Sequence, residues 1–259
     1  MIRATLKIAI PCLFIAVWTG GVSARAEDAP LSNLSAADRK QIESLLGSGI
    51  ILQPLPGAPL LAATDYLPKK GNKFTYTVME KGKKNRDEIH TIVPVQEPGS
   101  NETFRYDRSG VGRSSFVPEG EGLAVDREYD LDKQVVSTFN PPQPLIVSGL
   151  APGDNRESLI AVAVADIADP NDIDYRGKLK VTYSNLGRFR IKVPAGTYDA
   201  DLVKWTYAGD IGPASVETAQ YRFIAKDAGM VAMVQWRSVS AVLIYHERSR
   251  VARMLRKVE

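Results

Sequence analysis

Between Phe74 and His246, apolar side chains recur at every second position in short segments that glycine, proline and asparagine separate. Residues 74–78 alternate Phe, Tyr and Val with threonine, and residues 89–93 alternate again after the turn-forming stretch EKGKKN. A period of two is the period of a β-strand with one buried face. Further segments of this kind lie at 103–107, 123–131, 134–139, 158–166, 178–184, 188–193, 198–207, 218–225, 230–237 and 240–246.

So many short strands predict a mainly β protein: an antiparallel meander curled into an open barrel or half-barrel, with one short N-terminal helix. Residues 158–166 fit either a strand or a buried helix, and their alternating valines favour the strand. NPPQP at 140–144 is expected to break the series of strands. After Leu202 the parity of the apolar positions changes, which indicates a bulge near that residue or a strand buried on both faces.

The predicted helix begins after Ser35, a good N-cap, and carries Asp38 in its first turn. Gly47 is a suitable C-cap. The apolar stripe of this helix consists of Ile42, Leu45 and Leu46. The proline-rich connector QPLPGAPL at 53–60 cannot continue a helix, so we expect residues 27–60 to form a leader with one helix and residues 61–259 to form a single β domain.

The first 26 residues have the layout of a secretory signal peptide. A basic start is followed by an apolar run that ends in small residues before Ala26, and the run is too short to span a membrane. Pro11 stands before the single cysteine, Cys12, where a lipoprotein requires a small residue. We therefore predict cleavage after Ala26, a periplasmic location and no transmembrane span in the mature chain.

Removal of this peptide changes the charge argument. The chain has 33 basic and 30 acidic residues, and the three basic residues Arg3, Lys7 and Arg25 lie in the signal, which leaves 30 of each sign. The apparent basicity is thus no evidence for nucleic acid or an anionic membrane as a partner. Because Cys12 is also removed, the mature chain has no internal disulfide and depends on its core.

Three stretches resemble a family of exported bacterial β proteins of unknown function. YLPKKGNKFTYTV at 66–78 contains a G-N-x-F-T-Y strand, and VPAGTYDADLV at 193–203 contains a V-P-A-G-T-Y strand. QYRFIAKDAGMVAMV at 220–234 is similar to a later strand of that family. The resemblance runs in order from Tyr66 to Ile244. It implies a periplasmic β-meander or half-barrel related to lipoprotein-carrier folds, and it brings no catalytic residues.

Few residues suggest chemistry. His90 has the parity opposite to Ile89, Thr91 and Val93, so it is expected to face solvent, and His246 ends an apolar strand. Since the two histidines lie far apart in the sequence, we expect a structural or surface role for both and no metal or cofactor. The loop DIADPNDID at 166–174 could offer oxygen ligands to calcium, but its spacing is not that of an EF-hand, and a solvated turn is favoured.

The sequence also lacks the motifs typical of nucleophilic catalysis and of phosphate binding. RSGVGRSSF at 108–116 lacks the G-x-S-x-G elbow, and the glycine-rich loops do not precede helices. The basic C-terminal stretch HERSRVARMLRKVE at 246–259 fits an amphipathic helix on anionic lipid or an acidic partner, but an edge strand or frayed tail is favoured.

The sequence therefore favours a non-enzymatic cell-envelope protein that binds an apolar small molecule, a lipid or an envelope protein. The alternatives are a carboxylate-based hydrolase acting on an envelope polymer and a structural partner of an envelope complex. Aromatic residues on regularly patterned strands suggest one wall of an apolar cavity. The candidate ligand-binding residues are Phe74, Tyr76, Tyr183, Phe189 and Trp205.

Overall fold

A computed structural model describes residues 33–259 except 70, 121 and 242–244. The predicted signal peptide and its cleavage site lie outside these residues. A helix, α1 (Ala36–Leu46), and a short 3-10 helix, η1 (Ala63–Tyr66), accompany one antiparallel sheet. The strands are β1 (Ile51–Leu55), β2 (Lys73–Glu80), β3 (Arg86–Pro94), β4 (Phe104–Arg108), β5 (Gly112–Glu119), β6 (Gly122–Asp130), β7 (Val135–Pro144), β8 (Asn155–Asp166), β9 (Ile173–Val193), β10 (Gly196–Ile211), β11 (Ala214–Ala225), β12 (Gly229–Ala241) and β13 (Tyr245–Val258).

Strands β2 to β13 form a closed barrel. The strands pair in the order β9 to β13, then β2 to β8, and β8 pairs back onto β9 to complete the ring. This confirms the mainly β class with a short helix, but the predicted barrel was open, whereas this one is closed. The pairing of β13 with β2 closes the ring, because all its other neighbours are consecutive in the chain. One edge of the long strand β9 pairs with both β8, through residues 173–184, and β1, through residues 188–191. Closure leaves few unpaired strand edges.

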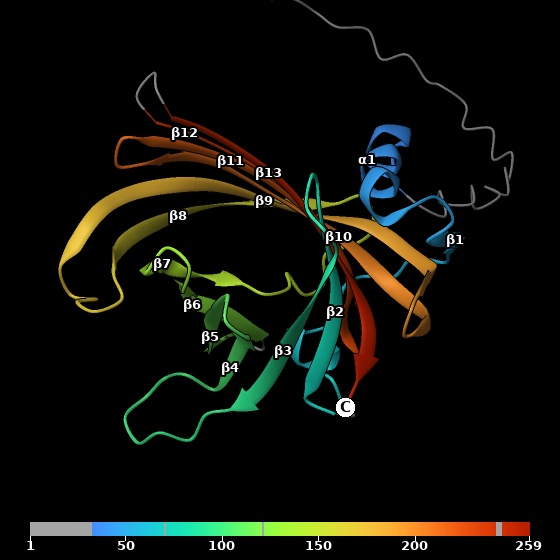
Figure 1. The fold of residues 1–259 in the computed structure, drawn as a ribbon. Helices are drawn as coiled ribbons and strands as arrows, with labels where there is room; N and C mark the ends of the chain where they lie inside the picture. Colours follow the sequence, from blue (N-terminus) through green and yellow to red (C-terminus); the bar gives the residue numbers. More distant parts are fainter. Residues whose placement is uncertain (1–32, 70, 121, 242–244) are drawn as a thin grey trace, which may run out of the picture.

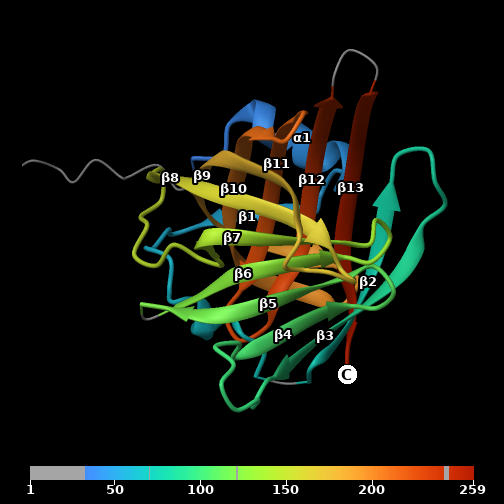
Figure 2. The ribbon, with the colours of Figure 1, turned by 90° about the vertical axis from the view of Figure 1, so that its left-hand side faces the viewer.

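The barrel has two differently oriented walls. Figure 2 shows strands β4 to β7 in front, crossing the direction of β11 to β13 behind them. Strands β9 and β10 pair along nearly their whole length, from Val193 and Gly196 to Gly177 and Ile211. A Cβ on Gly177 of β9 would lie 2.0 Å from the carbonyl oxygen of Asp210, so this approach requires glycine.

Helix α1 forms as predicted and is fixed to the sheet by polar contacts. Ser35 Oγ accepts a hydrogen bond from the N–H of Asp38 at 3.0 Å. The Asp38 carboxylate in turn accepts hydrogen bonds from Lys204 Nζ, at 2.8 Å, and from the Tyr221 hydroxyl. Because Lys204 and Tyr221 stand on β10 and β11, the first turn of α1 is tied to both strands. No helix among the described residues has the length and hydropathy to cross a membrane.

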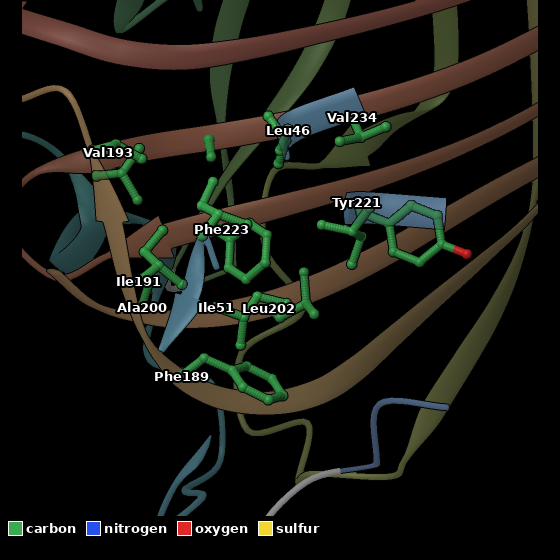
Figure 3. Packing of buried hydrophobic residues seen from close by; sticks show 14 of the residues in the cluster. Leu46, Ile51, Phe189, Ile191, Val193, Ala200, Leu202, Tyr221, Phe223 and Val234 are labelled. Atoms are coloured by element: carbon green, nitrogen blue, oxygen red, sulfur yellow. The ribbon is translucent and has the colours of Figure 1, made fainter. Parts of the chain in front are cut away.

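The helix and strands β4 to β7 lie on opposite sides of the long strands β9 to β13 (Figure 1). On the helix side, Ile42 and Leu46 of α1 pack with Phe189, Leu202 and Phe223 from the strands (Figure 3). We call this group the helix-side core. Its buried members are Ile42, Leu46, Ile50, Ile51, Leu186, Phe189, Ile191, Val193, Ala200, Leu202, Tyr221, Phe223, Ala225, Val231, Ala232, Val234, Ala252 and Leu255. Phe74 and Tyr76 pack with this cluster but also line the barrel interior.

The parity change around Leu202 has two parts. Leu202 belongs to the helix-side core and Val203 packs in the second core inside the barrel, so β10 is buried on both faces, one of the two predicted alternatives. The register also shifts here: Val203 pairs with Asn185 and Asp201 with Arg188, which places the extra residue in β9 rather than β10. This bulge turns the odd-numbered side chains of β9 from the barrel interior to the helix side.

One other sequence expectation is confirmed, and three change. Residues 158–166 form a strand, as favoured. NPPQP does not end its strand, since β7 continues to Pro144 and its irregularity is absorbed by a register shift against β6 between Val125 and Arg127. The basic C-terminal stretch forms β13, which is no edge strand because β12 and β2 pair on either side of it. The connector at 53–60 begins within β1.

Candidate ligand-binding cavity

The barrel interior contains a cavity of about 700 Å³ that opens to the surface. Interior volume remains because a barrel of about eight strands is just filled by its own side chains, whereas this one has twelve. Part of the wall is apolar. It includes Phe116, Val125, Phe139, Val162, Val164, Leu179, Ile211 and Val216. Ligand cavities commonly have this size and this largely apolar lining.

Strand alternation determines which residues face the cavity. Side chains that pair across neighbouring strands share a face, so rows of lining residues cross the sheet. One row across β3 to β7 consists of Ile92, Tyr106, Ser114, Glu128 and Ser137. Another across β10 to β13 consists of Val203, Arg222, Met233 and Arg253, of which the last three line the cavity.

The structure separates the five candidate residues. Phe74, Tyr76 and Trp205 line the cavity. Tyr183 lies behind the lining and packs edge-on against Trp205, with ring centroids 5.6 Å apart. Phe189 is fully buried in the helix-side core, because the β9 bulge turns it away from the interior. Ligand contact by the first four therefore remains a prediction, and Phe189 is placed on the other side of the sheet.

A cation covers the tryptophan. The Arg222 guanidinium lies 3.8 Å from the centre of the Trp205 ring, within the range of a cation–π contact. Its Nε and Nη2 atoms both donate to Gln220 Oε1, at 3.0 and 2.6 Å. Among the described residues, no carboxylate forms an ion pair with Arg222. Burial lowers the pKa of Arg222, while Tyr207 and Glu128 act in the opposite direction.

A buried polar network occupies another part of the interior. His90 is 1% exposed and faces inward, so the expectation that it faces solvent was wrong; its neighbour Ile89 is the exposed one, at 39%. His90 Nε2 donates to Glu88 Oε1 at 2.6 Å, and Tyr106 Oη donates to His90 Nδ1. This arrangement is that of a neutral imidazole, since a carboxylate can only accept. His246 is exposed, as a surface role requires.

The same network holds a buried ion pair. Arg253 donates to both oxygens of Glu88, from Nε at 3.0 Å and Nη2 at 3.3 Å. Burial alone opposes ionisation of Glu88, but the His90 hydrogen bond and the Arg253 charge overcome it and hold the pKa of Glu88 at about 2. Burial lowers the pKa of His90, and the contact with Glu88 only partly offsets this. Both groups therefore favour an ionised glutamate beside a neutral histidine.

The acids of the lining do not form a catalytic pair. Glu128 and Asp130 both line the cavity from β6. Glu128 pairs with Arg108 at 3.1 Å, and Asp130 accepts a hydrogen bond from the N–H of Lys133. Each of the two carboxylates is thus engaged by a donor of its own and is not paired with the other, as an acid–base pair would require. Within the described part of the chain, no group of three or more metal-ligating side chains is placed to hold an ion, and Asp166 of the acidic loop accepts from the N–H of Ala168.

The sequence pattern missed the polar half of the lining, which includes Arg222, Gln220, Tyr106 and Arg108. One signal could have found it. On β11, Gln220 and Arg222 alternate with Tyr221 and Phe223. If both faces of the sheet are covered, such a strand must bury its polar side chains as well as its aromatic ones. Which face the helix covers is a tertiary property that alternation alone does not contain.

No protein-family model matches the chain, and no curated protein matches it either. One similar solved structure is a "putative lipoprotein" from Parabacteroides distasonis, with a TM-score of 0.38 and 11% identity, covering 75% of this chain and 98% of that one. Another is a "putative exported protein with YmcC-like fold" from Bacteroides fragilis, with a TM-score of 0.43 and 11% identity, covering 78% of this chain and all of that one. Likenesses of this degree carry no inference, so the family resemblance stays an interpretation of the motifs.

Proposed function

We propose that this chain is an exported, non-enzymatic binding protein of the cell envelope that holds an apolar ligand inside its barrel. The observation that carries the proposal is the cavity of about 700 Å³ in a barrel whose other core is fully packed. The signal-like first 26 residues support an envelope location. A lipid or another elongated apolar molecule suits a cavity of this size and lining.

The carboxylate hydrolase is the weaker alternative. Such an enzyme needs two convergent carboxyl groups, one of them with a raised pKa. In this cavity Glu128 is paired with Arg108, and the nearby Glu88 has a lowered pKa. Asp201 does have a raised pKa through burial, but it accepts a hydrogen bond from Tyr66 at 2.7 Å and has no carboxylate beside it among the described residues.

The test is uptake of the neutral fluorescent probe N-phenyl-1-naphthylamine by purified mature protein. We expect saturable binding with enhanced emission at one site per chain. A cavity-filling variant, Val216→Trp, should reduce uptake, whereas Val234→Ile in the helix-side core should leave it unchanged. Absence of saturable uptake by the folded wild-type protein, or equal uptake by Val216→Trp, would overturn the proposal.

A further inference from the structure

The cavity lining carries more positive than negative charge. Five of its side chains are cationic: Arg108, Lys133, Arg222, Arg237 and Arg253. Among the described lining residues, only Glu128 and Asp130 are acidic, and Glu88 is the ion-pair partner of Arg253. The chain without its signal-like start has equal numbers of basic and acidic residues. The cavity lining therefore carries a positive surplus that the rest of this chain balances, and an uncompensated charge costs more the more deeply it is buried.

Existing pairs account for three of these cations. Arg253 is paired with Glu88, Arg108 with Glu128, and Lys133 with Glu247 at 3.7 Å. Arg222 and Arg237 form no ion pair with the described residues, and the contacts of Arg222 are the side-chain oxygen of Gln220 and the Trp205 ring. Both are neutral. Glu128 acts on Arg222 only at longer range and is already bridged to Arg108.

Arg222 is also held ready for a ligand. Its Nε and Nη2 atoms are fixed by Gln220, and Gln220 Nε2 donates in turn to Gln235 at 3.4 Å. Nη1 donates no hydrogen bond to any of the described residues. A guanidinium fixed in one orientation loses little conformational freedom when it binds a planar or tetrahedral anion.

A second donor faces the same space. The Tyr207 hydroxyl lines the cavity, and its oxygen accepts a hydrogen bond from Gln143 Nε2, which leaves its own proton available. Burial raises the pKa of Tyr207, so the hydroxyl keeps that proton. The Tyr207 ring contacts the Trp205 ring, 6.4 Å between centroids, on which Arg222 is stacked. A cation and a neutral donor thus flank one aromatic surface.

We infer that the ligand is an anionic amphiphile, a carboxylate or phosphate on an alkyl chain, with its acidic group at Arg222 and Tyr207 and its chain along the apolar wall formed by Phe116, Phe139 and Val216. This inference rests on the proposed function and adds the chemistry of the head group. The anion would supply the opposite charge that Arg222 lacks, and charge-assisted hydrogen bonds are the strong ones in a site of low dielectric constant.

The experiment is displacement of bound N-phenyl-1-naphthylamine by dodecanoate, dodecyl phosphate and dodecanol. The three competitors share an alkyl chain, and the neutral alcohol is the reference. We expect at least one of the two anions to displace the probe at a concentration about tenfold or more below that of dodecanol, as a hydrogen bond to a charged group implies. The stronger anion identifies whether carboxylate or phosphate is preferred.

Variants then assign the effect to Arg222. Arg222→Met should reduce the preference for the anion to near unity while dodecanol still displaces the probe. Arg222→Gln serves the same purpose if the methionine variant does not fold. The matched control is Arg113→Met: Arg113 stacks on Tyr129 at 4.0 Å in the same manner, but from the face of β5 that points away from the cavity. It should keep the full preference.

The outcomes separate the two proposals. Equal displacement by all three competitors from a wild-type protein that takes up the probe would overturn the anionic ligand and leave the apolar binding function standing. A full anion preference in folded Arg222→Met would overturn the assignment to Arg222. Failure of the wild-type protein to take up the probe at all would overturn the binding function itself.

Discussion

The long strands β9 to β12 present one face to α1 and the other to the barrel interior, and the two faces are filled differently. On the helix side, Phe189, Leu202 and Phe223 have no exposed surface and pack against a helix. On the interior face, Arg222, Gln220 and Trp205 border open volume. The backbone is shared, so the difference arises from what covers each face. A helix can supply side chains to a flat sheet, whereas a wide ring of strands must fill its centre from its own residues.

This comparison predicts that substitutions of the same type have opposite consequences on the two faces. Substitutions in the helix-side core should lower the free energy of unfolding and leave the affinity for the probe unchanged. Substitutions in the cavity wall should lower the free energy of unfolding less and change the affinity for the probe more. Four predictions follow this contrast.

Phe189→Ala should have the largest effect. It removes a fully buried ring from the helix-side core, and such a change costs about 3–5 kcal/mol of unfolding free energy. Urea unfolding followed by tryptophan fluorescence measures it. Probe uptake by the folded fraction should match that of the wild type. A loss below about 1 kcal/mol would mean that this core is not closely packed.

Acidification should destabilise the protein through the interior network. His90 and Glu88 both have lowered pKa values, so the unfolded chain binds more protons than the folded one in acid. Stability is fully present above the ordinary pKa of histidine, begins to decline below it, and declines further as pH falls from 4.5 towards about 2. Protonation of Glu88 accounts for about 3 kcal/mol of the lost unfolding free energy.

Urea unfolding at a series of pH values measures this decline, with Glu88→Gln as the comparison. That variant should be less stable at neutral pH, because Arg253 loses its buried partner. It should also lack the decline below pH 4.5 that Glu88 causes. A variant with the same acid dependence as the wild type would show that Glu88 is not the group responsible.

Phe139→Ala is the cavity counterpart of Phe189→Ala. Phe139 is only partly buried because one side of its ring faces the cavity. Its removal should cost about 1–2 kcal/mol, the transfer free energy of partly buried apolar surface, since the space beside it already exists. Affinity for the neutral probe should change more than for any helix-side variant. Equal stability losses for the two phenylalanines would remove the distinction between the faces.

Ser35→Ala should have the smallest effect. The Ser35 side chain caps α1, and loss of an N-cap costs about 1 kcal/mol. Circular dichroism and urea unfolding report it, and Ser35→Asn, which retains capping, should restore most of the loss. Probe affinity should stay at the wild-type value, because α1 lies on the side of the sheet away from the cavity. A change in probe affinity would contradict the expectation that α1 and the cavity act independently.

Alternation identified most of the strands and the residues that are buried, including Tyr76, Tyr183 and Trp205. It did not determine on which side a buried residue lies. Phe189 was grouped with Trp205 because both have the same apolar pattern, and one extra residue in β9 places them on opposite faces. Alternation predicts that His90 faces solvent if Ile89 is buried, whereas Glu88 and Tyr106 supply hydrogen-bond partners for His90 inside the barrel.

Closure of the barrel and its cavity also depended on long-range pairing. The β13–β2 ladder, which closes the ring, pairs residues 251–258 with residues 74–80, far apart in the sequence. Local periodicity carries no information on such partners, so the sequence predicted an open sheet with a basic edge strand. The helix was predictable because its cap, stripe and terminal glycine are all local.

The most direct test of the central claim is the crystal structure of the mature protein grown with dodecanoate. We expect an alkyl chain inside the barrel between Phe116, Phe139 and Val216, with the carboxylate within hydrogen-bond distance of Arg222. An interior filled by side chains, or dodecanoate bound only on the outer surface of the barrel, would contradict it.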